Sequence, residues 1–283
     1  MVPVSDLIKL LTLGQELSMA VKRKTYHFRK NDIIEVEEFH DGNYGAPGKA
    51  RTKREKPTQE QMQQVNALNK ARRCRHKLLE YFTEGDVFAT WTYEVKNRPP
   101  DMKKALKDFQ KAMRYVRKEY KKRDRELFWI RNIERGTKGA WHIHLVINEI
   151  GDTANIIKEA WEHGGTYICE IKLNEKIYDK DFSKLAAYMT KDENTTEKKK
   201  NGEKGKPRIK ESSYSTSRNM PLKEPKVDKL ARWKQVPKPK KGYYIEKIFE
   251  GVNPVTGFMY RRYTMYRDKG GGDDEADTHL HSG

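Results

Sequence analysis

The chain has 283 residues, enough for one large domain or for a main domain with appendages. Its 59 Lys and Arg against 41 Asp and Glu give a net charge of +18, which indicates a polyanionic partner, with nucleic acid ahead of membrane, and argues against a merely soluble basic protein. Cys74 and Cys169 form no C-x-x-C pair, which excludes a disulfide framework and a zinc ribbon and fits a reducing cytoplasm. No apolar run reaches the length of about 18 residues that a transmembrane helix needs.

The first third of the chain predicts a mixture of helix, strand and loop. Residues 1 to about 24 predict a short helix around Leu7 or a frayed terminus, and residues 26–39 have the pattern of a strand. Residues 41–57 are rich in Gly and Pro and predict a loop. A helix is expected from about residue 59 to residue 81. Its run of basic residues leaves a phosphate contact and a solvated face equally open.

The middle of the chain alternates strands with longer helices. The long helix is opened by Asp101 as its cap, and apolar residues recur along it at intervals of three and four. The order strand, helix, hairpin, helix, strand, helix predicts an α+β fold in which an antiparallel sheet has helices packed against it. The expected elements are strand 87–93, helix 101 to about 123, strands 128–134 and 141–148, a helix from 153, strand 167–171, and a helix from 182 to about 191.

The last third carries fewer apolar residues. Residues 193–210 are rich in Lys, Glu and Gly and predict a flexible loop, whereas residues 214–219 restore order. Prolines between residues 221 and 239 predict irregular structure. The alternation in 243–266 indicates a last hairpin, and the acidic segment 270–283 predicts a disordered tail.

These patterns predict a central domain with additions at both ends. We expect an N-terminal extension with strands over residues 1–57 and the main domain over residues 58–225. A C-terminal appendage with a hairpin is expected over 226–269, followed by the tail 270–283.

The strand Trp141–Asn148 carries two histidines at alternate positions. Because side chains alternate between the two faces of a strand, His142 and His144 share one face and can bind one metal ion. Glu134 ends the preceding strand, and a Gly-containing turn brings it beside the pair. Two histidines and one carboxylate leave coordination positions open, as catalytic metal sites require. The alternative is that both histidines are ordinary exposed or packed residues.

A second set of candidate residues lies on the helix over residues 182–191. Tyr188 and Lys191 are three residues apart and therefore share a face of this helix. A tyrosine can act as a nucleophile on phosphate, but its phenol pKa of about 10 means that it needs a metal ion and a nearby cation. Lys191 can supply that charge or hold the adjacent phosphate. A Tyr-x-x-Lys helix alone carries little meaning, and it gains specificity beside the predicted metal site.

The order of these motifs resembles a known family. The segment 88–93 reads Phe-Ala-Thr-Trp-Thr-Tyr, Glu134 follows with His142-Ile143-His144, and Tyr188-Met189-Thr190-Lys191 comes last. This order resembles the three motifs of the HUH endonucleases, specifically the replication initiator proteins of rolling-circle plasmids and bacteriophages. The segments 161–191 and 215–219 also resemble that family, and the resemblance extends over residues 25–225.

The resemblance implies an RRM-like sheet with flanking helices and a Mg²⁺- or Mn²⁺-dependent single-tyrosine DNA nickase and strand-transferase. Glu134, His142 and His144 would hold the metal, which polarises the scissile phosphate. Tyr188 would attack, giving a 5′-phosphotyrosine and a free 3′-OH for a polymerase. Because the bond energy is kept in the phosphotyrosine, the same site can rejoin ends. The resemblance further implies DNA contacts by Thr90, Thr92, Arg218 and Asn219.

The implied partners are single-stranded or hairpin origin DNA and a host helicase and polymerase, without a membrane, in the cytoplasm of a bacterial host. No G-x-x-x-x-G-K-[ST] run occurs, so unwinding is expected from another protein. One tyrosine occupies the motif position, and nothing in the sequence places Tyr178 or Tyr214 as a second hydroxyl.

Three alternatives remain. A plasmid relaxase and a single-tyrosine transposase share the histidine pair and the tyrosine, but relaxases usually place the tyrosine first, and such transposases are typically shorter. A protein of another class, a non-catalytic DNA- or RNA-binding module, needs only basic faces and exposed aromatic residues, since phosphate contacts dominate affinity.

Overall fold

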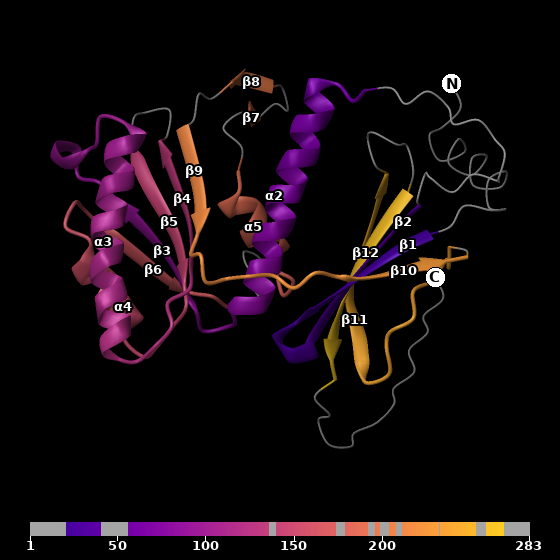
Figure 1. Cartoon of the computed structure of the whole chain (residues 1–283). Coiled ribbons are helices and arrows are strands. Elements are labelled where there is room, and N and C mark those ends of the chain that lie inside the picture. Colours follow the sequence, from indigo (N-terminus) through magenta and orange to yellow (C-terminus); the bar gives the residue numbers. More distant parts are fainter. Residues whose placement is uncertain are drawn as a thin grey trace, which may run out of the picture. The chain divides into compact units, whose positions relative to one another are not determined.

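The chain forms two compact units, which are described one at a time (Figure 1). Unit 1 comprises Met1–Arg51 and Pro225–Gly283, and unit 2 comprises Thr52–Glu224. The fold is α+β, as expected, with two five-stranded antiparallel sheets and four α-helices among the described residues. The computed structural model describes residues 21–40, 56–135, 140–173, 179–191, 196–198, 204–207, 211–231, 233–252 and 259–268.

Unit 1 is built on a sheet of strand order β10-β1-β2-β12-β11, in which every neighbouring pair is antiparallel. The predicted strand over residues 26–39 is wrong in one respect, because it is two strands that reverse at the 3₁₀ turn η1, Arg29–Asn31. These three residues all have positive φ angles, so the turn carries no Gly or Pro signal in the sequence. The strands are β1 (Val21–Phe28), β2 (Ile33–His40), β10 (Lys226–Leu230), β11 (Tyr243–Val252) and β12 (Met259–Arg267).

The C-terminal strands confirm one prediction for unit 1 and correct another. β11 and β12 pair as the expected last hairpin. The stretch 221–239, expected to be irregular, contains β10, which pairs with β1 at the edge of the sheet. An edge strand tolerates prolines at its ends, because only one of its sides pairs. The sheet of unit 1 therefore joins strands from both ends of the chain.

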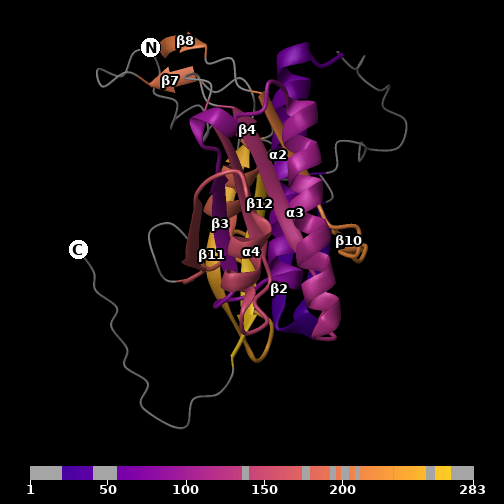
Figure 2. The same ribbon diagram turned by 90° about the vertical axis from the view of Figure 1, so that its left-hand side faces the viewer.

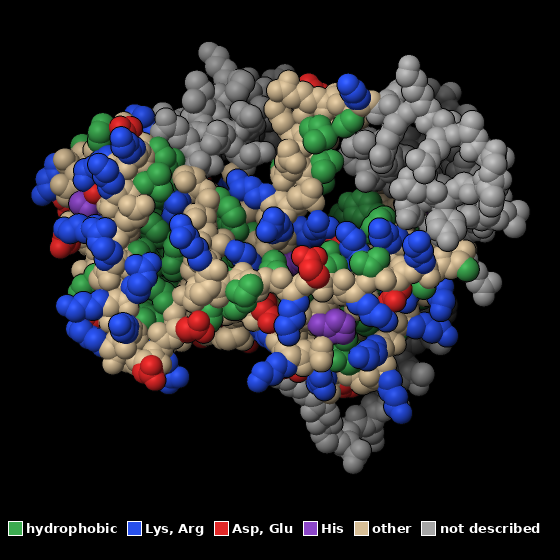
Figure 3. All heavy atoms as spheres, in the orientation of Figure 1, with side chains coloured by type: hydrophobic (Ala, Val, Ile, Leu, Met, Phe, Trp, Pro, Cys, Tyr) green, Lys and Arg blue, Asp and Glu red, His purple; other side chains and the backbone are tan. Residues whose placement is uncertain are grey.

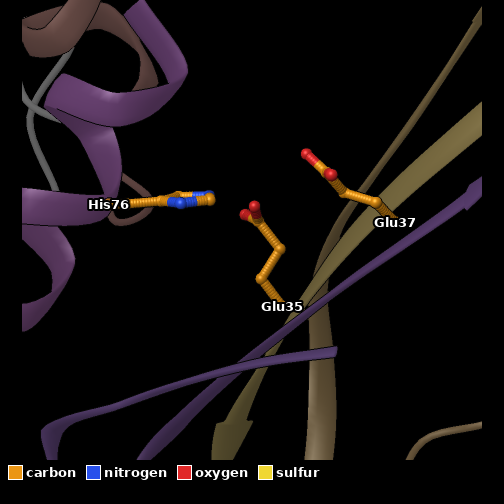
Figure 4. Close-up of side chains that lie close together, drawn as sticks. All are labelled: Glu35, Glu37 and His76. Carbon is orange, nitrogen blue, oxygen red and sulfur yellow. The ribbon is translucent and has the colours of Figure 1, made fainter. Parts of the chain in front are cut away.

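The two faces of β2 differ in character. Ile34 and Val36 point to one face and belong to a buried cluster, whereas Glu35 and Glu37 project together from the other face (Figure 4). The third residue labelled in Figure 4, His76, belongs to helix α2 of unit 2. The rest of the buried cluster comes from β12, namely Tyr263 and Met265.

Unit 2 is built on a second antiparallel sheet of strand order β6-β3-β5-β4-β9. Its chain order of β3, α3, the β4–β5 hairpin, α4, β6 and α5 confirms the order predicted from the sequence. The strands are β3 (Val87–Thr92), β4 (Trp129–Arg135), β5 (Trp141–Ile147), β6 (Thr166–Glu170) and β9 (Glu211–Thr216).

Four helices cover this sheet, with α3 and α4 on one face and α2 and α5 on the other (Figures 1 and 2). Their starts follow local signals: Thr58 and Gln61 form a reciprocal capping box for α2, and the Asp101 carboxylate accepts the Lys104 backbone N–H at 2.8 Å at the start of α3. The helices are α2 (Gln59–Tyr81), α3 (Met102–Lys122), α4 (Thr153–Ala160) and α5 (Ser183–Met189), with a 3₁₀ turn η2 at Val95–Asn97.

The main core of unit 2 lies between the sheet and the α3–α4 layer. Trp91 is fully buried and stacks on Trp161, with ring centroids 4.9 Å apart. Its indole N–H donates to the Ile157 carbonyl at 3.2 Å, so its polar atom is also satisfied. The predicted apolar stripe of α3 is confirmed, since Phe109, Met113, Val116 and Tyr120 are all buried.

One predicted loop of unit 2 contains structure. Thr196–Lys198 (β7) and Lys204–Pro207 (β8) pair as a small antiparallel sheet within the segment expected to be a loop. Its residues are almost all polar, so no apolar alternation marks these strands in the sequence. The expected N-terminal helix, apart from residues that open β1, and the acidic tail lie outside the described residues. None of the helices that the structure describes is both long and apolar enough to span a membrane.

Candidate active site

The register of three central strands places the polar candidates on one face of the sheet. Thr90 on β3 and Asn132 on β4 both lie opposite His144 on β5. One pair further along β4 and β5, Glu134 lies opposite His142. Side chains two positions apart share a face, and here they share the face covered by α2 and α5. The hairpin that was expected to bring Glu134 beside the histidines is therefore present, although residues 136–139 of its turn are outside the described part.

His144 is the centre of this arrangement. Its Nε2 atom lies 3.2 Å from Glu134 Oε1, and its Nδ1 atom lies 3.1 Å from Thr90 Oγ1. The imidazole is largely buried, with 7% of the residue exposed. Two polar neighbours on opposite sides of the ring fix its orientation, because each ring nitrogen has its own partner.

Tyr188 reaches the same imidazole from helix α5. Its hydroxyl oxygen lies 3.1 Å from Nε2 and 3.4 Å from Nδ1 of His144, and the two rings meet edge to face with centroids 5.0 Å apart. Lys191 follows just after the end of α5, and its ammonium lies 3.8 Å from the centroid of the Tyr188 ring. The structure thus brings Tyr188, Lys191, His144 and Glu134 together, although the tyrosine and the histidine are 44 residues apart in sequence.

His142 occupies the outer position of the pair. Its ring is parallel to that of His144, with the centroids 6.2 Å apart, and the residue is half-buried. Burial lowers the pKa of His142, the neighbouring His144 lowers it further, and the Glu134 carboxylate opposes both effects. A lowered pKa favours the neutral imidazole, which is the form that can bind a metal.

The three predicted metal ligands share a face without forming a closed cage. In the described part of the chain, the donor atoms of Glu134, His142 and His144 do not all lie within 4.8 Å of one another. A further oxygen atom belongs to the same face: Asn132 is almost fully buried and its Oδ1 atom has no hydrogen-bond partner among the described residues. A buried acceptor without a partner is unusual, and it adds an oxygen donor beside His144.

The residues expected to contact DNA fall into two places. Thr90 contacts His144, and the Thr92 hydroxyl donates to the Gly165 carbonyl at 3.3 Å. Arg218 and Asn219 lie beyond β9, where Asn219 donates to the Glu126 carboxylate and to the Leu127 carbonyl, both at 3.3 Å. The structure therefore does not bring Arg218 and Asn219 to the histidine site.

The two other tyrosines considered in the sequence differ from Tyr188. Tyr178 lies outside the described residues. Tyr214 lies on β9 opposite Asn132, where burial raises the pKa of its phenol, and the adjacent Cys74 thiol raises that pKa further. A raised pKa disfavours the phenolate, so Tyr214 is poorly suited to act as a nucleophile.

Two residues of the site were not singled out from the sequence. The Phe88 ring lies parallel to His144 at a centroid distance of 6.1 Å and meets Tyr188 edge-on at 5.9 Å. Asn132 is the other. Both were detectable in principle, because strand alternation puts Phe88 on the face of Thr90 and puts Asn132 on the face of Glu134.

Residues 86–193 match the family model of the replication-associated proteins of the ORF2 or gene 2 protein type. The matched stretch begins at the residue before β3, ends shortly after α5, and includes Glu134, both histidines and Tyr188. It covers less than half of the chain, and it leaves out α2, β9 and all of unit 1. No curated protein and no solved structure matches the chain. The part of the chain that carries the candidate site is therefore similar to replication-associated proteins.

Proposed function

We propose that unit 2 is a metal-dependent DNA nicking and joining enzyme that initiates rolling-circle replication through a single tyrosine. One observation carries the proposal: the Tyr188 hydroxyl lies 3.1 Å from His144 Nε2, and the same nitrogen lies 3.2 Å from Glu134 Oε1. A candidate nucleophile and two candidate metal ligands from separate segments thus converge on one point. The family match supports the link to replication.

The donor set fits a divalent cation. Glu134, His142 and His144 offer one carboxylate and two imidazoles on a single sheet face, and the buried Asn132 oxygen adds a neutral donor nearby. Such a set leaves positions open for a phosphate oxygen. Mg²⁺ or Mn²⁺ bound there would polarise the scissile phosphate and so make its phosphorus more electrophilic.

The side chains of the chain itself prepare the nucleophile. The His144 ring holds the Tyr188 hydroxyl within hydrogen-bond distance, while Thr90 and Glu134 fix that ring. The Lys191 ammonium over the Tyr188 ring adds a positive charge that favours the phenolate over the phenol. Phe88 packs against both His144 and Tyr188, which limits the motion of their rings.

The reaction exchanges one phosphodiester for another. The Tyr188 oxygen forms a bond to phosphorus as its phenolic proton departs, and the bond from phosphorus to the 3′ oxygen breaks. The leaving 3′ oxygen takes up a proton and becomes a free 3′-OH, while the 5′ end stays attached to Tyr188. Because no phosphodiester is lost, a 3′-OH can attack the phosphotyrosine and reverse the step, which is how one site both nicks and joins.

A covalent-adduct assay tests this proposal. The full-length protein is incubated with a labelled, randomised single-stranded oligonucleotide pool and Mn²⁺, with and without a chelator, and is then separated under denaturing conditions. Tyr188→Phe removes the nucleophile, and Tyr167→Phe is the matched control, because Tyr167 is an exposed tyrosine that lies opposite Thr90 on the neighbouring strand β6.

We expect a protease-sensitive, metal-dependent adduct for the unaltered protein and for Tyr167→Phe, and none for Tyr188→Phe. Peptide mapping of the adduct should locate the nucleotide on Tyr188. An adduct that persists in Tyr188→Phe would move the nucleophile elsewhere. An adduct that forms equally well with chelator would contradict the role of the metal, and oligonucleotide binding without any adduct would favour a binding module.

A further inference from the structure

A second feature of unit 2 lies on the opposite face of its sheet. A cleft of about 910 Å³ runs between helix α3, the start of β4 and the end of β9. Arg131 and Trp129 line it from β4, at positions that alternate with Asn132 and Glu134 of the candidate active site. The cleft is therefore separated from the Tyr188 hydroxyl by the sheet itself. Figure 3 shows Lys and Arg side chains over α3 and a strip of hydrophobic side chains between α3 and β9.

Arg131 is a buried cation that opens onto this cleft. The residue is 6% exposed, and its guanidinium lies over the Phe109 ring, 4.9 Å from the centroid. One terminal nitrogen donates to the Ser213 carbonyl at 2.5 Å and to the Ser213 hydroxyl at 3.2 Å. The Nε atom has no partner, and no carboxylate pairs with Arg131 among the described residues. A buried charge without a counter-ion is costly, so an anion supplied from outside would stabilise it.

The rim of the cleft adds five exposed cations. None of them forms an ion pair with a described residue, and the carboxylates that line the cleft are two, Asp124 and Glu126. Other cations of α3 are paired: Lys104 with Asp108 and Lys111 with Glu162, at 2.5 and 2.7 Å. The cleft therefore keeps a surplus of positive charge that the structure does not neutralise. The five rim cations are Arg114, Arg117, Lys121, Arg125 and Arg218.

An aromatic wall indicates which kind of anion fits. Trp129 is half-buried, lines the cleft, and is braced edge-on by Phe109 at a centroid distance of 5.3 Å. An indole beside arginines can stack on a nucleic-acid base while the arginines hold the phosphates, whereas inorganic phosphate gains nothing from the ring.

We propose that this cleft binds the phosphate backbone of a DNA strand, with Arg131 as the buried anchor, the α3 cations and Arg218 as the rim, and Trp129 as a stacking surface. The inference rests on the proposed function, because it names a second contact for the same substrate on the face away from the chemistry. The contact would hold the strand while its scissile phosphate is at Tyr188. It also gives Arg218 a place that the histidine site does not.

Binding measurements with two matched triple variants test the cleft. The first variant, Arg114→Gln, Arg117→Gln and Lys121→Gln, removes three rim cations of α3 without touching the buried Arg131, so folding is spared. The second, Lys103→Gln, Lys107→Gln and Lys118→Gln, removes the same charge from exposed positions of α3 outside the cleft. Affinity for a labelled single-stranded oligonucleotide is measured by fluorescence anisotropy with chelator, over a series of salt concentrations.

We expect the cleft variant to bind about 10-fold more weakly than the control variant, and its salt slope to be smaller by about 2, since each phosphate contact on a single strand contributes about 0.7. Equal affinity and equal slope in the two variants would overturn the proposal. A second arm adds pyrophosphate and measures thermal unfolding. If the two variants bind the oligonucleotide equally and pyrophosphate stabilises only the control, the ligand is a free phosphate compound, and the assignment to DNA fails.

The adduct assay keeps this inference separate from the proposed function. Adduct formation with equal binding by the two variants would leave nicking in place and remove the cleft. Loss of binding in the cleft variant without any adduct in the unaltered protein would leave the cleft as a DNA-binding site and remove the nicking reaction.

Discussion

The two faces of the unit 2 sheet use the same strands for different purposes. On the α3–α4 face, Trp91, Ile143 and Leu145 are fully buried in the main core. On the α2–α5 face, the next residues along the same strands are Thr92, His142 and His144, which carry polar and ring contacts. Strand alternation therefore separates stability from chemistry by a single residue step, so neighbouring positions should respond to substitution in opposite ways.

The first prediction concerns the core face and is the largest in free energy. Trp91→Ala should lower the free energy of unfolding by about 3–5 kcal/mol, because it removes a fully buried indole and leaves a cavity. It also removes the stack on Trp161. Urea unfolding followed by circular dichroism measures the change. A loss below about 1 kcal/mol would show that this face is not the stabilising one.

The second prediction concerns the site face. His144→Ala should slow adduct formation by about 100-fold, which corresponds to about 2.7 kcal/mol in activation free energy. The substitution removes a proposed metal ligand and the group that holds the Tyr188 hydroxyl. Its effect on unfolding should be smaller than that of Trp91→Ala. The measurement is the rate of adduct formation over a series of Mn²⁺ concentrations.

More metal should partly restore the activity of His144→Ala, because a weakened site is filled at higher concentration. An unchanged rate in this variant would remove His144 from the site. A rate that falls only in proportion to the loss of folded protein would erase the distinction between the two faces.

The sequence predicted most of unit 2 because its signals are local. The stripe of α3 repeats at intervals of three and four, and the alternation of β5 places His142 and His144 on one face. The meeting of Tyr188 with His144 needed more than a pattern, since it depends on how α5 packs on the sheet. Resemblance in motif order supplied that link, and the contact at 3.1 Å agrees with it.

The features that the sequence did not predict depend on long-range pairing. The sheet of unit 1 joins β1 and β2 to strands more than 180 residues away, and its pairing with β10 has no local marker. The turn at Arg29–Asn31 lacks Gly and Pro. Arg131 was invisible as a buried cation, because only the packing of Phe109 and β9 against it removes it from water.

The third prediction concerns how the site face is ordered. Thr90→Val should slow adduct formation by about 10-fold, or about 1.4 kcal/mol, because the Thr90 hydroxyl lies 3.1 Å from His144 Nδ1 and fixes the ring. Thr90→Ser keeps the hydroxyl and should restore most of the rate, whereas a purely structural role would make Val the better replacement on a strand. Equal rates for Val and Ser would assign the effect of residue 90 to packing.

The smallest predicted effect distinguishes two tyrosines on neighbouring elements. Tyr214→Phe should leave the rate of adduct formation within about twofold of the unaltered protein and should cost about 1 kcal/mol of stability through the lost hydrogen bond to the Cys74 thiol. Burial raises the pKa of Tyr214, and that of Cys74 to about 12, so neither group ionises readily near neutral pH. Tyr188 instead has an imidazole and an ammonium beside it. If Tyr214→Phe slowed the reaction as much as His144→Ala, the reacting face would extend across Asn132 to β9, and one tyrosine would no longer account for the chemistry.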